Sequence, residues 1–273
     1  MRADLAVVCE PDYWRFGMTC TTNRDEVVSM LHEPERSTRM IRRFLGIADD
    51  EFIELTAFCF NKPWVAQCSN IETHVGLLET AETLRGYNGS YILLNGPLNP
   101  ELGARYDQDC WVPAWNSRAS DRDIRKRRAV FIDIDPIRPK GISATNDEQR
   151  AAWEVTNRIH NYFIEKIGEA TIGWGSSGNG YFLLIAIEPV ANPADYTEPI
   201  NRLLKLLHRK FGTEQVSIDT SVANPARLMC APGTWKRKGR STPERPHRLT
   251  TFRCSFDEAT GEIARVPIGA LIP

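Results

Sequence analysis

The chain has 273 residues, and its 34 Lys and Arg nearly balance its 35 Asp and Glu, for a net charge of −1. With 42% hydrophobic and 25% charged residues it has the composition of an ordinary globular protein, which excludes a collagen-like or intrinsically disordered chain. The longest apolar run, Tyr181 to Ile187, is far shorter than the ~20 residues that span a bilayer. The N-terminus lacks the pattern of a signal peptide, so we expect a cytoplasmic protein with no membrane partner.

Charge is divided unevenly along the chain. Residues 1–120 hold 11 Lys and Arg against 17 Asp and Glu, a net of −6, whereas residues 121–273 hold 23 against 18, a net of +5. Such asymmetry is a weak hint of a part that binds a polyanion. A basic face that is simply solvated explains the same numbers.

The first 121 residues carry scattered signals for secondary structure, read from apolar periodicity and from turn-forming residues. The expected elements are one or two short amphipathic helices over 23–45, broken near Glu33-Pro34; strands at 51–60 and 89–94; and loops at 95–100 and 106–121, the last carrying Trp111 and Trp115.

From residue 127 the signals sharpen into a strand-helix-strand-strand-helix-strand order. That order predicts an α+β fold with a ferredoxin-like, RRM-type sheet covered by helices on one face, preceded by an N-terminal α/β extension. The expected elements are a strand over 129–135 ended by Pro136, a helix capped by Thr145 and Glu148 and ended by Gly168, strands at 171–174 and 181–187, a helix through Ile200 and Leu207 ended by Gly212, and short strands at 216–219 and 227–230 that complete the pattern.

The most informative motif is FIDIDP, at residues 131–136. Side chains alternate across a strand, so Asp133 and Asp135 project from the same face about 6.5–7 Å apart. Carboxylates that close repel one another unless a cation lies between them or one is protonated, and oxygen donors of this kind suit Mg²⁺ or Mn²⁺. A solvent-facing strand end is the alternative, but the apolar flanks favour a metal site.

Two further motifs contribute polar groups. The stretch WGSSGNGY, at residues 174–181, predicts a tight hairpin whose glycines also let backbone amides approach phosphate oxygens. After the strand that ends at Asp219, a third candidate carboxylate, a basic region surrounds Trp235, and that ring could stack on a base. A mobile basic loop is an equally good interpretation of this region, whose cations are Arg227, Lys236, Arg237, Lys238, Arg240, Arg245 and Arg248.

Taken together and in this order, the motifs resemble the archaeo-eukaryotic primase superfamily, in particular the primase-polymerase domains of phages and plasmids. The resemblance covers roughly residues 51–253 and rests on RRAVFIDIDPIRPKGISAT, SSGNGY, SIDTSVANPARL, PGTWKRKG, ERPHR and, upstream, YILLNGPLNPELGAR. It implies a DNA-dependent nucleotidyltransferase with two divalent metals, a single-stranded DNA template, nucleoside triphosphates and, in some relatives, a helicase partner. The implied metal ligands and catalytic residues are Asp133, Asp135 and Asp219, and the implied nucleotide-binding residues are Ser177, Gly178, Asn179, Phe182, Arg227, Lys236 and Lys238.

One position departs from the family pattern. Phe182 stands where the family usually has a histidine that contacts the incoming nucleotide, and a phenyl ring donates no hydrogen bond. A catalytically weakened nucleic-acid-binding module is therefore the alternative function, and a metal-dependent phosphodiesterase using the same carboxylates is a more distant one. The expected organisation is a helical segment at 1–50, a core at 51–255 with its catalytic module at about 122–255, and a tail at 256–273.

Overall fold

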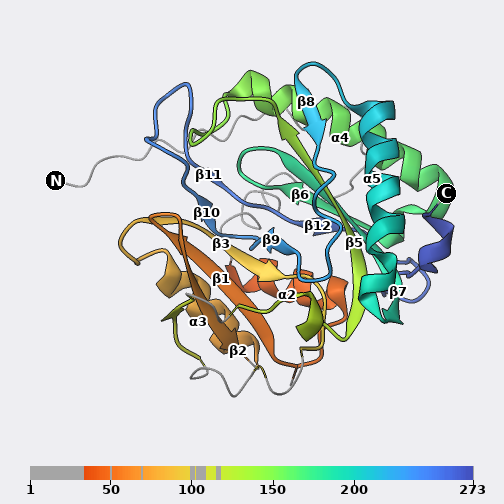
Figure 1. The fold of residues 1–273 in the computed structure, drawn as a ribbon, viewed down its shortest axis with the longest axis horizontal. Helices are drawn as coiled ribbons and strands as arrows, with labels where there is room; N and C mark the ends of the chain where they lie inside the picture. The colour runs from red at the N-terminus through yellow and green to blue at the C-terminus, as the bar shows by residue number, and fades with distance from the viewer. Residues whose placement is uncertain are drawn as a thin grey trace.

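The strands form two five-stranded sheets and a two-stranded ribbon, as seen in a computed structural model that describes residues 34–49, 51–68, 70–98, 102, 109–114 and 118–272 (Figure 1). The predicted helical residues 23–33, residues 99–100 of the first loop and Trp115 of the second lie outside these described ranges. None of the helices in the described ranges is both long and apolar enough to cross a membrane.

The N-terminal extension folds into the first sheet, with strand order β4-β2-β1-β3-β9. Both predicted strands form. The structure adds β2, whose proline and glutamine hide its strand character, and α3, whose first turn is capped by the Asn70 side chain accepting from the Thr73 amide. The elements are α2 (Pro34–Leu45), β1 (Ile53–Cys59), β2 (Lys62–Cys68), α3 (Ile71–Ala81), β3 (Tyr87–Leu93) and β4 (Val112–Pro113).

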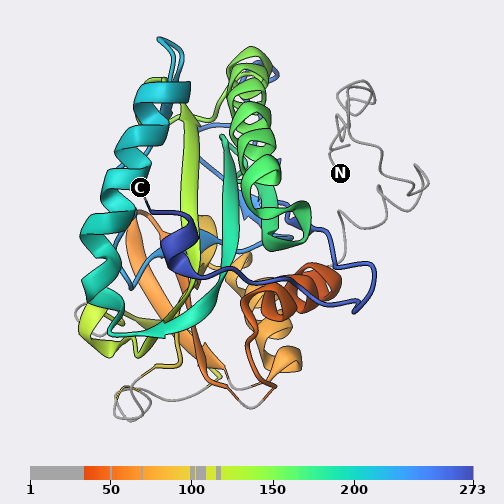
Figure 2. The same cartoon turned by 90° about the vertical axis from the view of Figure 1, so that its right-hand side faces the viewer.

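The second sheet confirms the predicted ferredoxin-like fold. Its strands are antiparallel in the order β12-β6-β7-β5-β8, and α4 and α5 run side by side over one face (Figure 2). The elements are β5 (Lys126–Pro136), α4 (Asn146–Ile167), β6 (Ile172–Ser176), β7 (Tyr181–Ala191), α5 (Thr197–Phe211), β8 (Val216–Ile218) and, added at the edge, β12 (Arg253–Cys254).

Local sequence signals set the ends of the long helix. Thr145 accepts a hydrogen bond from the Glu148 amide at 3.1 Å, and the Glu148 carboxylate accepts one from the Thr145 amide at 2.8 Å, so the predicted capping box is confirmed. Gly168 ends the helix with φ +80°, a conformation that favours glycine.

The last predicted strand belongs to the other sheet. We expected residues 227–230 to complete the ferredoxin-like sheet, but β9 (Leu228–Cys230) pairs with β3, with Cys230 opposite Tyr91. Since β8 already occupies the edge beside β5, the chain crosses to the open edge of β3 and joins the two sheets. The remaining short elements are β10 (Trp235–Lys236), β11 (Arg248–Leu249), η2 (Asp121–Asp123), η3 (Glu169–Thr171), η4 (Pro193–Tyr196) and η5 (Ile268–Ala270).

A single hydrophobic cluster connects both sheets and the N-terminal helix. It contains Phe44 of α2, Leu55 and Ile92 of the first sheet, and Ile132 and Leu184 of the second, all buried. Packing of this kind holds the two sheets as one body, and the face of the second sheet that α4 and α5 leave uncovered is turned toward the first. The boundaries predicted at residues 50/51, about 122 and 255/256 stay predictions.

Candidate active site

Strand register brings three carboxylates to one face of the second sheet. The Asp219 amide donates to the Asp133 carbonyl oxygen at 2.9 Å, which continues the β5–β8 ladder by one residue beyond Ile134 opposite Ile218. Residues directly opposite in antiparallel strands share a face, and so do residues two apart along one strand. Asp133, Asp135 and Asp219 therefore lie together on the face away from α4 and α5.

Burial and mutual repulsion make this an electrostatically costly arrangement. Burial first, and then the charge of Asp135, raise the pKa of Asp133 well above its ordinary value, while Arg227 opposes the shift. Burial likewise raises the pKa of Asp135, against the lowering effects of Arg138 and Lys238. Burial is the main cause of both shifts, so a cation bound at this face would favour the charged carboxylates.

Arg227 stands between two of the carboxylates. Its Nη2 lies 4.0 Å from Asp133 Oδ2 and 3.8 Å from Asp219 Oδ2, and its Cζ lies 5.9 Å from the centroid of the Phe131 ring. The other oxygen of Asp219 is held by the amide and hydroxyl of Ser221, at 2.8 and 2.7 Å. One oxygen of Asp219 is therefore fixed by its own turn, whereas the other faces the guanidinium.

The SSGNG stretch forms the predicted hairpin between β6 and β7, and most of its donors are used within the turn. The Gly180 amide donates to the Ser177 hydroxyl at 3.0 Å, and the Gly178 amide donates to the Ser176 hydroxyl at 3.1 Å. Asn179 is 3% exposed; its Oδ1 accepts from the Ala144 amide, and its Nδ2 has no hydrogen-bond partner in the described part of the chain. A buried amide donor without an acceptor is costly, which makes Asn179 an unusual buried polar residue.

Three glycines seat this hairpin against the acids and against the first sheet. A Cβ on Gly180 would lie 2.7 Å from Asp135 Oδ1, so the hairpin touches the carboxylates directly. A Cβ on Gly178, which has φ +82°, would lie 2.5 Å from Lys236 Cβ, and one on Gly89 of β3 would lie 3.1 Å from Lys236 Nζ. Lys236 thus spans from the hairpin to the first sheet across space that two glycines leave open.

Lys236 is a cation without an anion. Its Nζ lies 4.1 Å from the centroid of the Tyr91 ring, and no carboxylate of the described residues lies within 4.0 Å of it. Burial, and then the charge of Lys238, lower the pKa of Lys236 to about 7. An anion at this point would restore the charged form, so Lys236 is suited to meet a phosphate.

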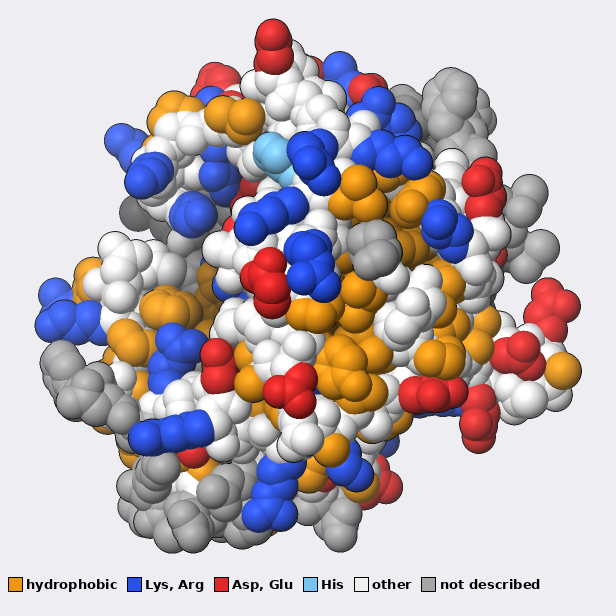
Figure 3. Space-filling model, turned by 45° about the vertical axis from the view of Figure 1, so that its right-hand side comes forward, with side chains coloured by type: hydrophobic (Ala, Val, Ile, Leu, Met, Phe, Trp, Pro, Cys, Tyr) orange, Lys and Arg blue, Asp and Glu red, His pale blue; other side chains and the backbone are white. Residues whose placement is uncertain are grey.

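The rest of the basic region divides into cations that hold the fold and cations that do not. Arg245 donates to both oxygens of Glu148 and to the Ser143 carbonyl, and Arg248 donates to the Ala144 carbonyl, so these two arginines fasten the loop that precedes α4. Arg237 Nη2 lies 3.9 Å from Glu82 Oε2, so this arginine also has a partner within the fold. Lys and Arg side chains also gather over the upper part of the face drawn in Figure 3.

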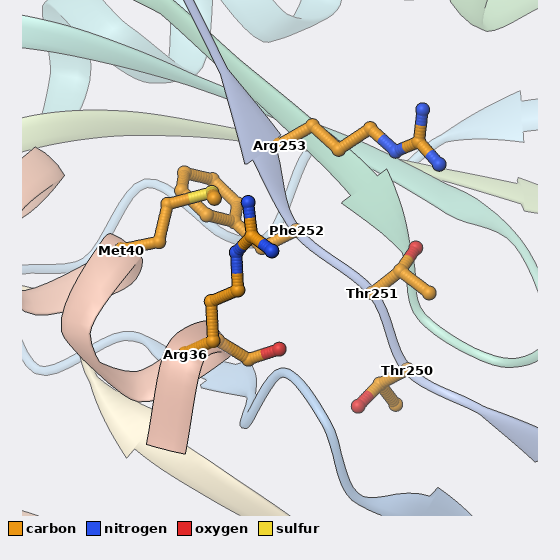
Figure 4. A pocket seen from close by; sticks show the side chains of 7 residues that line it. Arg36, Met40, Thr250, Thr251, Phe252 and Arg253 are labelled. Carbon is orange, nitrogen blue, oxygen red and sulfur yellow. The ribbon is translucent and has the colours of Figure 1, made fainter. Parts of the chain in front are cut away.

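Phe182 shares the face of Asp133 but does not reach the surface. Its side chain is 0% exposed and stacks on Phe252 with ring centroids 6.3 Å apart, and its centroid lies 5.9 Å from that of Phe131. On its far side Phe252 contacts Phe44 of α2 and lines a small pocket with Met40 (Figure 4). Among the predicted nucleotide-binding residues, Phe182 is therefore the one whose side chain is fully buried.

The donor set fits Mg²⁺ or Mn²⁺ in chemistry. Asp133, Asp135 and Asp219 offer oxygen ligands alone, and a divalent cation would stabilise the charged form of the first two, whose pKa values are raised mainly by burial. No three His, Cys, Asp or Glu side chains in the described ranges stand close enough together to chelate an ion as placed. In the observed arrangement Arg227 lies between Asp133 and Asp219 instead.

Three residues of the candidate site were not predicted from the sequence. Tyr91 and Gly89 come from β3, which the sequence does not connect to the FIDIDP strand, and Arg138 acts on Asp135 from the loop after β5. The one available signal was that two basic residues, Arg138 and Lys140, follow the strand, the first of them three positions after Asp135.

Comparison with known proteins gives a distant likeness in fold. No family model matches the sequence, and no curated protein matches it. The AEP domain of the primase-polymerase of cyanophage S-2L is 18% identical with a TM-score of 0.48, over 87% of this chain and 97% of that one. Primase RepB′ is 13% identical with a TM-score of 0.42, over 84% of this chain and 59% of that one. Both of these proteins are named as primases or primase-polymerases.

Proposed function

We propose that this protein is a DNA-dependent primase-polymerase that performs template-directed nucleotidyl transfer in the replication of a mobile element or phage. The observation that supports this proposal most strongly is a combination of three features. Three carboxylates share one face at the ends of β5 and β8, the hairpin between β6 and β7 contacts Asp135, and Lys236 has no anionic partner among the described residues. A triphosphate bound between Lys236 and the carboxylates would be attracted by the positive charge of the lysine. The divalent cations that accompany the triphosphate would be bound by the carboxylates.

In this proposal Asp133, Asp135 and Asp219 hold two Mg²⁺ or Mn²⁺ ions. Such ions lower the pKa of an attacking hydroxyl and neutralise the leaving pyrophosphate. The 3′-hydroxyl of a primer or initiating nucleotide would lose its proton to water, and its oxygen would form the bond to the α-phosphorus as the bond to pyrophosphate breaks. Little acid–base chemistry is then asked of the protein, whose main contribution is placement and charge.

The remaining residues of the site bind and orient the triphosphate. Lys236 and Lys238 supply positive charge, and the Asn179 Nδ2, which has no partner among the described residues, would donate to a phosphate oxygen beside the Ser177–Gly178 turn. Arg227 completes the set. A single-stranded DNA template, nucleoside triphosphates and a replicative helicase are the proposed partners, in the cytoplasm.

A specific observation favours a second candidate function, a nucleic-acid-binding module with weakened catalysis. Phe182 fills the β7 position directly opposite Asp133 with a fully buried phenyl ring, so this position supplies no polar contact to a nucleotide. Losing one such contact costs on the order of a hundred- to thousandfold in rate. The fold and the binding surface would survive that loss.

Extension of a labelled primer and de novo dinucleotide synthesis, each with Mg²⁺ or Mn²⁺, separate the two candidates. Wild type should extend, Asp133→Asn should not, and Glu188→Gln should extend normally because it makes the same change on an exposed residue of β7. If wild type and Asp133→Asn are equally inactive but both bind single-stranded DNA, the binding module replaces the enzyme.

A further inference from the structure

The guanidinium of Arg227 is held by charge rather than by hydrogen bonds to the acids. Its distances of 4.0 and 3.8 Å to Asp133 and Asp219 exceed hydrogen-bond length, and its Nε is buried without a partner among the described residues. Its side chain is 28% exposed. A cation that satisfies so few of its donors is loosely fixed, and it retains donors for another anion.

The position of Arg227 conflicts with a divalent cation on the same two carboxylates. A cation ligated by Asp133 and Asp219 would lie within a few ångströms of the guanidinium, where like charges repel strongly in a partly buried site. The Phe131 ring, 5.9 Å from Arg227 Cζ, provides a surface over which the guanidinium can turn aside while keeping a favourable contact.

We propose that Arg227 is an exchangeable counter-cation: it neutralises Asp133 and Asp219 until a divalent cation binds there, and it then turns to the triphosphate. This inference rests on the proposed function, because it needs the metal site. It makes Arg227 oppose metal binding while it favours nucleotide binding. A residue that served phosphate contact alone would leave metal affinity unchanged.

Lys238 provides the matched comparison. Its charge also lowers the pKa values of Asp133 and Asp135, but no ion pair within 4.0 Å joins it to either. Replacing Lys238 therefore removes nearby positive charge without clearing the space between Asp133 and Asp219. The pair Arg227→Met and Lys238→Met separates displacement from a general charge effect.

The first experiment titrates the nucleotide-free protein with Mn²⁺ and reads free Mn²⁺ by electron paramagnetic resonance. We expect Arg227→Met to bind Mn²⁺ about tenfold more tightly than wild type, and Lys238→Met at most about twofold more tightly. Asp133→Asn should lose the site, and a non-hydrolysable triphosphate analogue should bind Arg227→Met more weakly. Equal or weaker Mn²⁺ binding by Arg227→Met, or an equal gain in Lys238→Met, overturns the proposal. Mn²⁺ binding by none of the proteins removes the metal site, and with it the proposed function too.

A second measurement uses the wild-type protein, so that it does not depend on a variant's folding. The side-chain Nε–Hε signal of Arg227, assigned with Arg227→Lys, should shift on addition of Mg²⁺. Arg127 is the internal control, because its Nη2 is anchored on the Pro193 and Ala223 carbonyl oxygens. An Arg227 signal that stays in place while Mg²⁺ binds overturns the proposal.

Discussion

The two ends of strand β5 carry charged side chains in opposite circumstances. At its start, Arg127 donates to the Pro193 and Ala223 carbonyl oxygens, and Arg128 pairs with Glu51 at 2.5 Å. At its end, Asp133 meets the Arg227 guanidinium only at 4.0 Å. Burial lowers the pKa of Arg127 to about 10, yet that arginine keeps its two carbonyl partners, whereas burial raises the pKa of Asp133 and Arg227 only partly opposes that shift.

This difference separates charges that hold the fold from charges that await a ligand. A buried charge costs free energy unless it is paired and hydrogen-bonded, so a fold retains an underpaired one where a partner from solution supplies the compensation. The start of β5 fastens the sheet to its surroundings. The end of β5 is the place to look for a cation and its substrate.

The largest expected effect is on catalysis at the acidic end. Asp133→Asn should lower primer extension by about ten-thousandfold, about 5.5 kcal/mol of barrier, because it removes a metal ligand from a group that acts as a unit. It should not lower the free energy of unfolding, since it removes a carboxylate that Asp135 and Asp219 repel. Urea unfolding and single-turnover extension measured on one preparation test both halves. A large loss of stability would place Asp133 among the structural charges.

The second effect is on stability at the other end. Arg128→Met should lower the free energy of unfolding by about 3–5 kcal/mol, because it leaves Glu51 as an unpaired, nearly buried carboxylate. The double variant Arg128→Met/Glu51→Met should recover most of that loss, since it removes both charges. At temperatures below the unfolding midpoint of Arg128→Met, primer extension per folded molecule should equal that of wild type. A selective loss of extension would show that β5 does not divide its charges in this way.

The third effect tests the position where the sequence departs from its family pattern. Phe182→His should lower the free energy of unfolding by about 2–3 kcal/mol, because the imidazole would lose its stacking on Phe252 and bury polar atoms without partners. Phe182→Leu, the apolar control, should cost less. We expect no gain in extension from the histidine. A sharp gain would show instead that this position reaches the nucleotide and that phenylalanine is the cause of weak activity.

The sequence could predict features whose signals are local. The capping box at Thr145, the glycine stop at Gly168 and the alternation that puts Asp133 and Asp135 on one face all depend on residues close together in the chain. The βαββαβ order was readable for the same reason. Each helix or strand in that order is a pattern within about twenty residues.

What the sequence could not predict depends on pairing between distant segments. The placement of β9 beside β3 follows from which sheet edge is open, and the contact of Lys236 with Tyr91 follows from that placement. The burial of Phe182 depends on Phe252, seventy positions later. The sequence also could not show which cations of the basic region hold the fold, because that depends on their partners. Arg245 pairs with Glu148, whereas Lys236 has no anionic partner among the described residues.

The smallest effect concerns the pH dependence of triphosphate binding at Lys236. Its ammonium has a pKa of about 7 because of burial and the charge of Lys238, and it faces the Tyr91 ring. An anion binds the charged form, so binding above pH 7 must take up a proton, and the affinity for a non-hydrolysable analogue should fall as pH rises from 7 to 9, by at most about tenfold per pH unit.

Two variants isolate this contribution from the titration of the terminal phosphate itself, which has a pKa of about 6. Lys236→Arg keeps its charge at every pH, so binding should persist and lose the extra pH dependence. Lys236→Met should bind more weakly at pH 6.5 and converge with wild type near pH 9. Calorimetry in buffers of different ionisation enthalpy counts the protons directly. If wild type and Lys236→Arg take up the same number of protons, Lys236 is already charged before the triphosphate arrives, and its titration contributes nothing to the pH dependence of binding.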